Sequence, residues 1–421
     1  MRDWLLGQPL LLGWIGPAGI ALAVGAVVAL WAWRTRLLRP VGQAVVFTAG
    51  VVTAVAAWAL VDGVWRPVAE GLGWVVWSWV GLIALAAAQL VAGPWRRRGP
   101  RRRPLAFALG GTAAVGCVVL GCLLTLNAHY STYPNLAALT GANVTIVPWD
   151  EAHLETDGRT GERGQLVEAH IPSSDPDFSP RPGLVYVPPA YRAEDRPELP
   201  VMVLLAGQPG GPTDWPTVGR AVETLDAFAA KHGGRAPIVV FPDHLGGALV
   251  NPLCSDAQHG KVATYLQEDV PRWLEQHLDV AEDRPWAVGG ISNGGTCALQ
   301  VVTRDPERYS VLMDMSGETH PTLGDEQRTL DQGYGGDVAA MADNDPLTLM
   351  QRERYPEVKA IFSAGERDEE FGPDTQTVAD AARAAGMDVQ VRHYPGGHAW
   401  SVWSVAFADQ LPWAAREMGI R

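Results

Sequence analysis

Acidic residues are almost absent from the first third of this chain of 421 residues, which is 47% apolar and 19% charged. Residues 1–126 contain eleven arginines but only three acids, a net charge of +8, so residues 127–421 carry −21 of the overall −13. Such an acidic globular part has no basic face to meet phosphates, so we expect no nucleic acid as a partner. Lysine is also scarce: three lysines stand against thirty arginines, a ratio typical of GC-rich bacterial, for example actinobacterial, genomes.

The usual sequence patterns of metal and cofactor sites are missing as well. No two histidines stand at H-x-x-x-H spacing, no Cys-x-x-Cys occurs, and no phosphate-binding glycine loop precedes a helix. We therefore expect no metal and no organic cofactor.

Cysteines number only four. Cys117 and Cys122 lie in an apolar stretch, where they act as small apolar side chains. Cys254 and Cys297 could form a disulfide in an oxidising compartment, but their spacing does not decide it.

Charged side chains are also missing from four long stretches near the N-terminus. Each stretch is about as long as the ~20 residues that a spanning helix needs, and none has the polar face of a helix in a soluble bundle. Tryptophans cluster near the ends, as interfacial anchors do. The sequence therefore predicts an all-α transmembrane domain over residues 1–127. Its four helices are expected at about residues 9–33, 41–65, 71–95 and 104–127.

Arginine placement predicts the orientation of these helices. Arginines gather in residues 34–39 and 96–103, after the first and third helices. By the positive-inside rule these loops are cytoplasmic, so both chain ends and everything after residue 127 lie outside the cytoplasm, in a multi-pass protein of the plasma membrane. Asp62 stands at the outer end of its helix, which favours an interfacial position over a functional acid within the membrane.

From residue 164 on, short apolar runs alternate with helical stretches. Strand alternating with helix predicts a mostly parallel sheet with helices on both faces over residues 165–421, preceded by a linker and lead-in over residues 128–164. Ligands of such sheets bind at the carboxyl ends of the strands. The predicted strands cover residues 165–172, 183–187, 201–205, 238–241, 287–291, 310–315, 359–363 and 389–393. The predicted helices cover residues 218–231, 261–278, 294–304, 375–385 and 401–417.

A G-x-S-x-G pattern follows the fifth of these strands. Residues 290–294 read G-I-S-N-G and a helical stretch comes directly after them. In this arrangement a sharp turn between strand and helix lifts the serine hydroxyl above the sheet, and the glycines relieve crowding around it. The pattern alone is weak in a glycine-rich chain, but the strand before it and the helix after it favour Ser292 as a nucleophile.

A serine hydroxyl needs a base to take its proton, and in this topology the chain order is serine, acid, histidine. Of ten histidines, only His398 follows the last predicted strand, in a turn that can return its imidazole to the serine. His320 is the alternative base. His393 falls within a strand, which indicates a packed or surface residue.

The acid is expected in the loop after residues 359–363, where four acids crowd together. Asp368 is favoured, because a carboxylate three residues past the glycine is a common position for this member. Glu366 and Glu369 remain alternatives, and the other acids of the loop are expected to face solvent.

Attack on an ester carbonyl places negative charge on its oxygen, which two backbone N–H groups can stabilise. One donor is expected from Asn293, directly after the nucleophile. The other is expected from the loop at residues 205–211, where the Gln208 amide is the candidate and Pro209 is excluded because it has no N–H.

With these motifs in place, residues 165–420 resemble the putative-esterase family of α/β-hydrolases, which includes esterase D and the actinobacterial mycolyltransferases. The more specific parts of the likeness are the segment at residues 262–274 and the ending at residues 397–403. The resemblance implies an α/β-hydrolase fold and transfer or hydrolysis of acyl esters through an acyl-serine. The chain departs from the mycolyltransferases by favouring Asp368 where they use Glu and by carrying Asn293 where they carry Met.

Together these features predict a membrane-anchored serine esterase that acts on an acyl ester of the cell envelope. An acyltransferase that moves the acyl group to a sugar or lipid hydroxyl is the alternative, and a non-catalytic envelope-binding scaffold is an alternative of another class. The expected partners are the lipid bilayer and an ester substrate that could be lipid-linked. Residues 322–349, which follow the sixth main strand, are a candidate lid.

Overall fold

The computed structural model separates the chain into two compact units, Met1–Leu136 and Ala137–Arg421, called unit 1 and unit 2 below. Each unit is described by itself. The residues that the structure describes are 10, 15–35, 40–66, 72–91, 104–130, 132–152, 154, 163–281 and 283–420.

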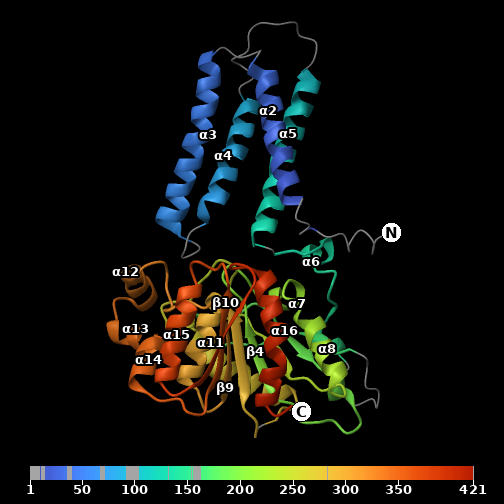
Figure 1. Ribbon diagram of the computed structural model, residues 1–421, viewed down its shortest axis with the longest axis vertical. Helices are drawn as coiled ribbons and strands as arrows, with labels where there is room; N and C mark the ends of the chain where they lie inside the picture. Colours follow the sequence, from blue (N-terminus) through green and yellow to red (C-terminus); the bar gives the residue numbers. More distant parts are fainter. Residues whose placement is uncertain are drawn as a thin grey trace. The chain divides into compact units, whose positions relative to one another are not determined.

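Unit 1 is built from long apolar α-helices (Figure 1). α2 packs along α5, and α4 contacts both α3 and α5. Small residues allow the close contact of α2 with α5: a side chain on Gly121 would begin 2.6 Å from the carbonyl oxygen of Gly19. The helices are α2 Ile15–Thr35, α3 Pro40–Leu60 with its π-helical continuation η1 Val61–Trp65, α4 Gly73–Val91 and α5 Pro104–Tyr130.

The prediction of four membrane-spanning helices is not supported. Among the described residues, a single helix, Val41–Trp65, has the length and apolar composition that crossing a membrane requires. The other apolar helical stretches are shorter: Pro17–Ala29, Gly73–Ala88 and Thr112–Ala128. Most of the arginines behind the predicted orientation, at residues 36–39 and 96–103, lie outside the described residues.

Asp62 joins the end of α3 to the start of α4. One of its carboxylate oxygens accepts a hydrogen bond from the Trp77 indole at 2.6 Å, and the other accepts from the Leu72 backbone N–H at 3.2 Å. Its place in η1 is consistent with a structural carboxylate at a helix end.

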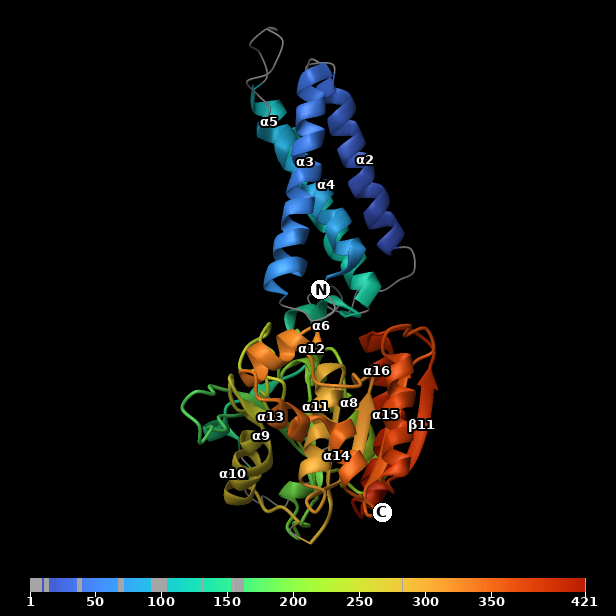
Figure 2. The same cartoon turned by 90° about the vertical axis from the view of Figure 1, so that its left-hand side faces the viewer.

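Unit 2 contains a nine-stranded sheet in its described part, with the order β1-β2-β3-β5-β4-β8-β9-β10-β11. β3 pairs antiparallel with β2 and β5, and every other pair is parallel. β4 and β5 are buried along their whole length, as expected of strands covered on both faces, whereas β11 forms an edge (Figure 2). The strands are β1 Ile146–Val147, β2 Gln165–Ala169, β3 Gly183–Val187, β4 Val201–Leu205, β5 Ile238–Phe241, β8 Trp286–Ile291, β9 Tyr309–Met315, β10 Lys359–Gly365 and β11 Asp388–Tyr394.

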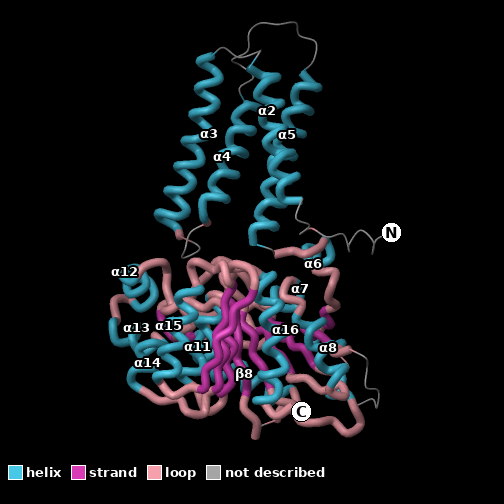
Figure 3. The backbone as a smooth tube through the Cα atoms, viewed as in Figure 1, coloured by secondary structure: helices cyan, strands magenta, loops and turns pink. Residues whose placement is uncertain are grey.

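Helices flank this sheet on both sides (Figure 3). α8 packs against α16, while α14 contacts both α11 and α15. The prediction of a mostly parallel sheet between helical layers is confirmed. The principal helices are α8 Ala221–Lys231, α10 Val270–His277, α11 Asn293–Arg304, α15 Gly372–Ala384 and α16 Trp400–Glu417, and shorter ones are η4 Pro189–Arg192, α7 Asp214–Thr217, α9 Val262–Thr264 and η5 Tyr265–Asp269.

Two segments contain structure that the sequence did not predict. The expected linker at residues 128–164 includes α6 Leu136–Thr140, η3 Trp149–Glu151 and β1, which extends the sheet beside β2. The candidate lid at residues 322–349 is helical, and its helices are α12 Glu326–Arg328, η6 Thr329–Gly333, α13 Val338–Asn344 and α14 Pro346–Arg352.

A disulfide joins Cys254 to Cys297, with their Cα atoms 5.4 Å apart. Both cysteines are buried, and the bond ties the loop after β5 to the second turn of α11. Cys117 and Cys122 of unit 1 are free.

Candidate active site

Ser292 lies on a sharp turn between β8 and α11, with backbone angles φ 52° and ψ −125°. A positive φ is unfavourable for a residue with a Cβ atom and costs about 1–3 kcal/mol, which the surrounding structure must offset. Crowding makes the flanking glycines necessary: a Cβ on Gly290 would lie 2.2 Å from the Gly294 carbonyl oxygen, and one on Gly294 would lie 2.3 Å from that of Ala206.

Backbone hydrogen bonds hold this turn in place. The Ser292 N–H donates to the Met315 carbonyl at 2.9 Å, which ties the turn to the end of β9. The Ser292 carbonyl accepts from the N–H groups of Gly295 at 2.8 Å and Thr296 at 3.1 Å, which begins α11. The serine therefore stands at the positive end of a helix dipole, at the carboxyl ends of the strands.

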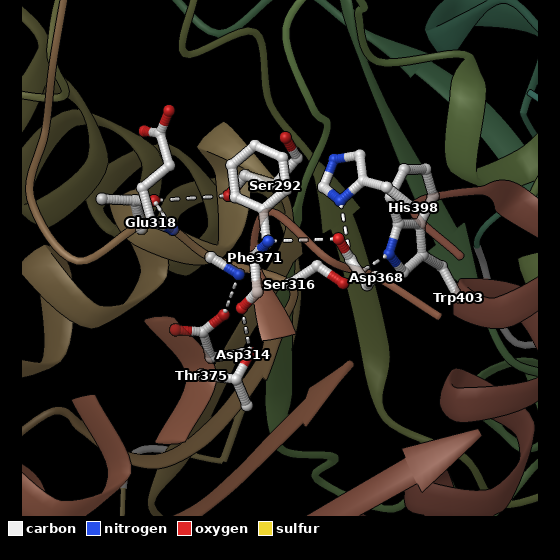
Figure 4. Close-up of polar contacts among 11 residues, drawn as sticks. Ser292, Asp314, Ser316, Glu318, Asp368, Phe371, Thr375, His398 and Trp403 are labelled. Atoms are coloured by element: carbon white, nitrogen blue, oxygen red, sulfur yellow. Dashed lines mark hydrogen bonds and ion pairs between the residues drawn. The ribbon is translucent and has the colours of Figure 1, made fainter. Parts of the chain in front are cut away.

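His398 and Asp368 form a hydrogen-bonded pair at this same end of the sheet (Figure 4). The His398 Nδ1 atom lies 3.0 Å from a carboxylate oxygen of Asp368. The Asp368 side chain is 1% exposed and that of His398 28%, so the acid is shielded while the imidazole still reaches solvent. Glu366 and Glu369, the alternative acids, are both exposed.

The surroundings of Asp368 favour its charged form. Burial alone would raise its pKa, but the hydrogen bond and charge of His398 act in the opposite direction. The Phe371 backbone N–H, at 3.1 Å, and the Ser316 hydroxyl also stabilise the anion, so the net effect lowers the pKa of Asp368. The carboxylate is thus ionised at neutral pH and can hold the imidazole in one orientation.

Aromatic side chains on two sides fix the plane of the His398 ring. Phe371 stacks on it with ring centroids 4.2 Å apart, and Trp403 meets it edge-on at 4.8 Å. The Trp403 indole donates to the Ser316 hydroxyl at 3.2 Å. Because Ser316 follows Met315, whose carbonyl accepts from the Ser292 N–H, this network connects the histidine to the turn that carries Ser292.

The sequence reasoning missed Ser316 and Phe371 as parts of this site. Ser316 has φ 56°, and its N–H donates to the Ser363 carbonyl at 2.7 Å. An available signal was the S-G pair that directly follows β9, the strand beside β8. Phe371 gave no distinct signal in the sequence.

The other histidines considered are placed elsewhere. The His320 side chain is 57% exposed, and its Nδ1 atom lies 2.7 Å from a carboxylate oxygen of Asp345. His393 lies on β11 and is exposed, consistent with a surface residue.

The predicted oxyanion loop lies against the turn that carries Ser292. A Cβ built on Gly207 would be 3.5 Å from the Ser292 Cβ, so the backbone just before Gln208 borders the serine. Asn293 is the first residue of α11, and its side-chain amide donates to the Asn251 side chain at 3.3 Å. The two backbone segments expected to bind an oxyanion are therefore both beside Ser292.

A buried carboxyl group, Asp314, lies beneath the first turn of α11. One of its oxygens accepts a hydrogen bond from the Gly317 N–H at 2.9 Å. The same oxygen lies so close to α11 that a Cβ atom on Gly295 would be only 2.5 Å from it. The other oxygen has no hydrogen-bond partner among the described residues. Burial raises the pKa of Asp314 to about 7, against a smaller opposing effect of the Gly317 hydrogen bond. Within the described part of the chain, no three His, Cys, Asp or Glu side chains gather as a metal site.

Sequence comparison places this site in a known family. Residues 179–414, more than half of the chain, match the family described as Putative esterase, and the chain belongs to this family. An uncharacterised protein of Corynebacterium glutamicum is 32% identical over 403 residues, which cover 92% of this chain and 91% of that protein. The MPT51 antigen of Mycobacterium leprae is 32% identical over 111 residues, covering 26% of this chain and 34% of that protein.

Solved structures show the same fold. A ferulic acid esterase superposes with a TM-score of 0.53 at 22% identity, covering 61% of this chain and 99% of its own. An S-formylglutathione hydrolase from Agrobacterium tumefaciens gives 0.52 at 21% identity, covering 62% and 98%. Unit 2 therefore has the α/β-hydrolase fold of an esterase. Membership of the Putative esterase family supports activity as an ester hydrolase or acyltransferase.

Proposed function

We propose that this protein is a membrane-anchored serine esterase that acts on an acyl ester of the cell envelope through an acyl-serine intermediate. The observation that carries the proposal is the hydrogen bond of His398 to the buried Asp368, a pair that is linked through Ser316 and Trp403 to the turn that holds Ser292 at positive φ.

In this mechanism Ser292 Oγ attacks the ester carbonyl while His398 Nε2 takes the hydroxyl proton. Asp368 keeps the Nδ1 proton of the imidazole directed away from the serine, which leaves Nε2 free as the base. The backbone N–H groups of Asn293 and Gln208 bind the oxyanion of the tetrahedral intermediate. His398 then gives its proton to the leaving alkoxide, and water or another hydroxyl attacks the acyl-serine by the reverse steps.

A fluorophosphonate probe tests the nucleophile, because it phosphonylates only an activated serine. We expect labelling of the wild-type protein, none of Ser292→Ala, and full labelling of Ser179→Ala, a control at an exposed serine outside the site. Equal labelling of Ser292→Ala would refute the assignment. A wild-type protein that is folded but unlabelled would favour the non-catalytic scaffold.

Product analysis distinguishes hydrolysis from transfer, because both reactions use the same acyl-serine. The purified enzyme is incubated with envelope lipids, with and without added sugar or lipid hydroxyls, and the products are identified by mass spectrometry. A free acid as the dominant product under both conditions supports the esterase, whereas a new ester that needs the acceptor supports the acyltransferase.

We further propose that unit 1 anchors the enzyme in the plasma membrane, with unit 2 outside the cytoplasm. Several large apolar side chains of α3 and η1 are exposed, such as Val41 at 70% and Trp65 at 59%, which lipid would cover. The Cys254–Cys297 disulfide favours an oxidising compartment for unit 2.

Fractionation and protease protection test this location. The full chain should stay in the membrane pellet after alkaline extraction, and protease added to spheroplasts should digest unit 2. Release into the supernatant, or protection of unit 2, would contradict the proposal. Deleting residues 1–126 then asks whether the helices also present substrate: undiminished turnover of a bilayer-embedded ester would leave them as an anchor alone.

A further inference from the structure

An ion pair that the mechanism does not use lies behind the oxyanion loop. Arg181, in the segment between β2 and β3, donates from Nε and from one terminal nitrogen to the two carboxylate oxygens of Asp243, both at 2.7 Å. The Arg181 backbone N–H donates to the same carboxylate at 2.7 Å. Asp243 follows β5 and its side chain is fully buried, whereas that of Arg181 is 34% exposed.

The terminal nitrogen that holds Asp243 also donates to the Gly210 carbonyl at 3.0 Å. This contact is tight, because a Cβ on Gly211 would lie 2.9 Å from the guanidinium. Two further bonds fix the same stretch: the Gly210 N–H donates to the Ala248 carbonyl at 3.1 Å, and the Gly211 N–H donates to the Asp214 carboxylate at 2.8 Å. The end of the oxyanion loop is therefore held from three directions, and Arg181 supplies the only charged donor among these bonds.

The beginning of the loop is confined by the nucleophile turn, through Ala206 against Gly294 and Gly207 against Ser292. Between these fixed points stands the Gln208 peptide, whose N–H is the proposed oxyanion donor. Gly210 is two residues from Gln208, so a shift of its carbonyl changes the direction of that N–H. A donor must lie within about 2.7–3.1 Å of the oxyanion to act on it.

Both members of the pair keep their charges across the working pH range. The hydrogen bond to Asp243 raises the pKa of Arg181, against the effect of burial. Burial would raise the pKa of Asp243, but the bonds from Arg181 outweigh it and lower the pKa. The pair is thus a fixed bidentate contact rather than a titrating one.

We infer that Arg181 and Asp243 are positioning residues that hold the oxyanion loop so that the Gln208 N–H faces the transition state. This inference deepens the proposed function and depends on it. A misdirected donor weakens binding of the transition state and leaves ground-state binding unchanged, so kcat should fall while KM stays nearly constant.

The test compares Arg181→Lys with the control variant Arg220→Lys. Arg220 is an exposed arginine that also forms an ion pair, with Glu223. Lysine keeps the charge beside the buried Asp243 but cannot bond Asp243 and Gly210 in the same geometry. With a short soluble ester, we expect kcat to fall about 10- to 100-fold for Arg181→Lys, with KM within about twofold, because removing an oxyanion donor outright costs about 10²- to 10³-fold. Phosphonylation by the fluorophosphonate should slow by a similar factor, since its oxygen binds in the same hole.

A second variant, Arg181→Met with Asp243→Leu, removes both charges and leaves neither one buried and unpaired. It should show the same loss of kcat with an unchanged melting temperature. The inference would be overturned if either variant is folded and has a kcat within twofold of wild type. It would also be overturned if a lowered melting temperature accounts for the whole loss of kcat. Fluorophosphonate labelling of Ser292→Ala is measured alongside. If Ser292→Ala is still labelled, the proposed function itself is refuted. If Ser292→Ala is not labelled but Arg181→Lys is fully active, only this inference is refuted.

Discussion

Units 1 and 2 are both rich in apolar residues, yet they place them in opposite ways. In unit 2 the strands β4 and β8 beside Ser292 are buried along their length, and few large apolar side chains among the described residues reach the surface. In unit 1 most of α3 is exposed, and Trp74 at the start of α4 is 79% exposed. The difference is what the proposed membrane anchor would require, because apolar side chains in water are normally buried whereas lipid can cover those that remain exposed.

The polar side chains differ in the same way. In unit 2, carboxylates, imidazoles and hydroxyls converge at the carboxyl ends of β8, β9 and β10, where Asp368 and Ser316 are buried. The described helices of unit 1 contain one acidic residue, Asp62, and its side chain joins two helix ends. Catalysis should therefore depend on unit 2 alone, and stability should respond separately in each unit.

Asp368→Asn should give the largest effect, and it tests whether chemistry is confined to unit 2. Asparagine keeps the shape but no longer holds the imidazole in the required tautomer, so kcat should fall about 10⁴-fold, equivalent to about 5.5 kcal/mol. The measurement is kcat on a soluble ester. Asp62→Asn, the matched change in unit 1, should leave kcat within twofold. Similar losses of kcat in both variants would contradict the expectation that catalysis depends on unit 2 alone.

Removing the disulfide should give the next largest effect. The bond closes a loop with a sequence separation of 43 residues, so Cys254→Ala with Cys297→Ala should lower the free energy of unfolding of unit 2 by about 4 kcal/mol. Urea unfolding followed by tryptophan fluorescence measures it. Cys117→Ala with Cys122→Ala is the control in unit 1 and should not move this transition. An unchanged midpoint after loss of the disulfide would show that unit 2 is stabilised by its core alone.

Asp314→Asn should act in the opposite direction, as a net gain in stability that appears only at higher pH. The pKa of Asp314 is about 7 in the folded protein and about 3.9 when unfolded, so folding keeps this group protonated. Its cost to stability is absent below pH ~4, grows as the pH rises to 7, and then levels off at about 4 kcal/mol. The buried amide of the variant costs about 2 kcal/mol, which leaves a net gain of about 2 kcal/mol at pH 8. Urea unfolding at pH 4 and pH 8 checks this, and an equal difference at both pH values would contradict it.

The sheet could be predicted from the sequence because its strands are short β-branched runs closed by Gly, Pro or Asp. All eight predicted strands correspond to strands of the structure within a few residues. β1 was missed because two residues carry no periodic signal, and α12 to α14 were missed because they are short and partly exposed. In unit 1 the helices were predicted from their missing charges, a signal of composition that does not report how many of them cross a membrane.

For the site, the sequence could propose Ser292 and His398, because each sits in a local motif. It left the acid open among neighbouring carboxylates, since burial separates Asp368 from Glu366 and Glu369 and burial depends on packing. Ser316, Phe371 and the pair behind the oxyanion loop come from distant segments. Their roles follow from contacts that only the folded chain creates.

Asp62→Ala should give the smallest effect, and it sharpens the comparison from the side of unit 1. The variant loses the bonds to Trp77 and Leu72, which hold α3 against α4. Hydrogen bonds between membrane helices contribute about 0.6 kcal/mol on average and those to charged groups somewhat more, so unit 1 should lose about 1 kcal/mol. Thermal unfolding in mild detergent measures this loss, with kcat on a soluble ester as the second readout. A fall in kcat at unchanged stability would show that the helical unit acts on the catalytic one, contrary to the expectation that catalysis depends on unit 2 alone.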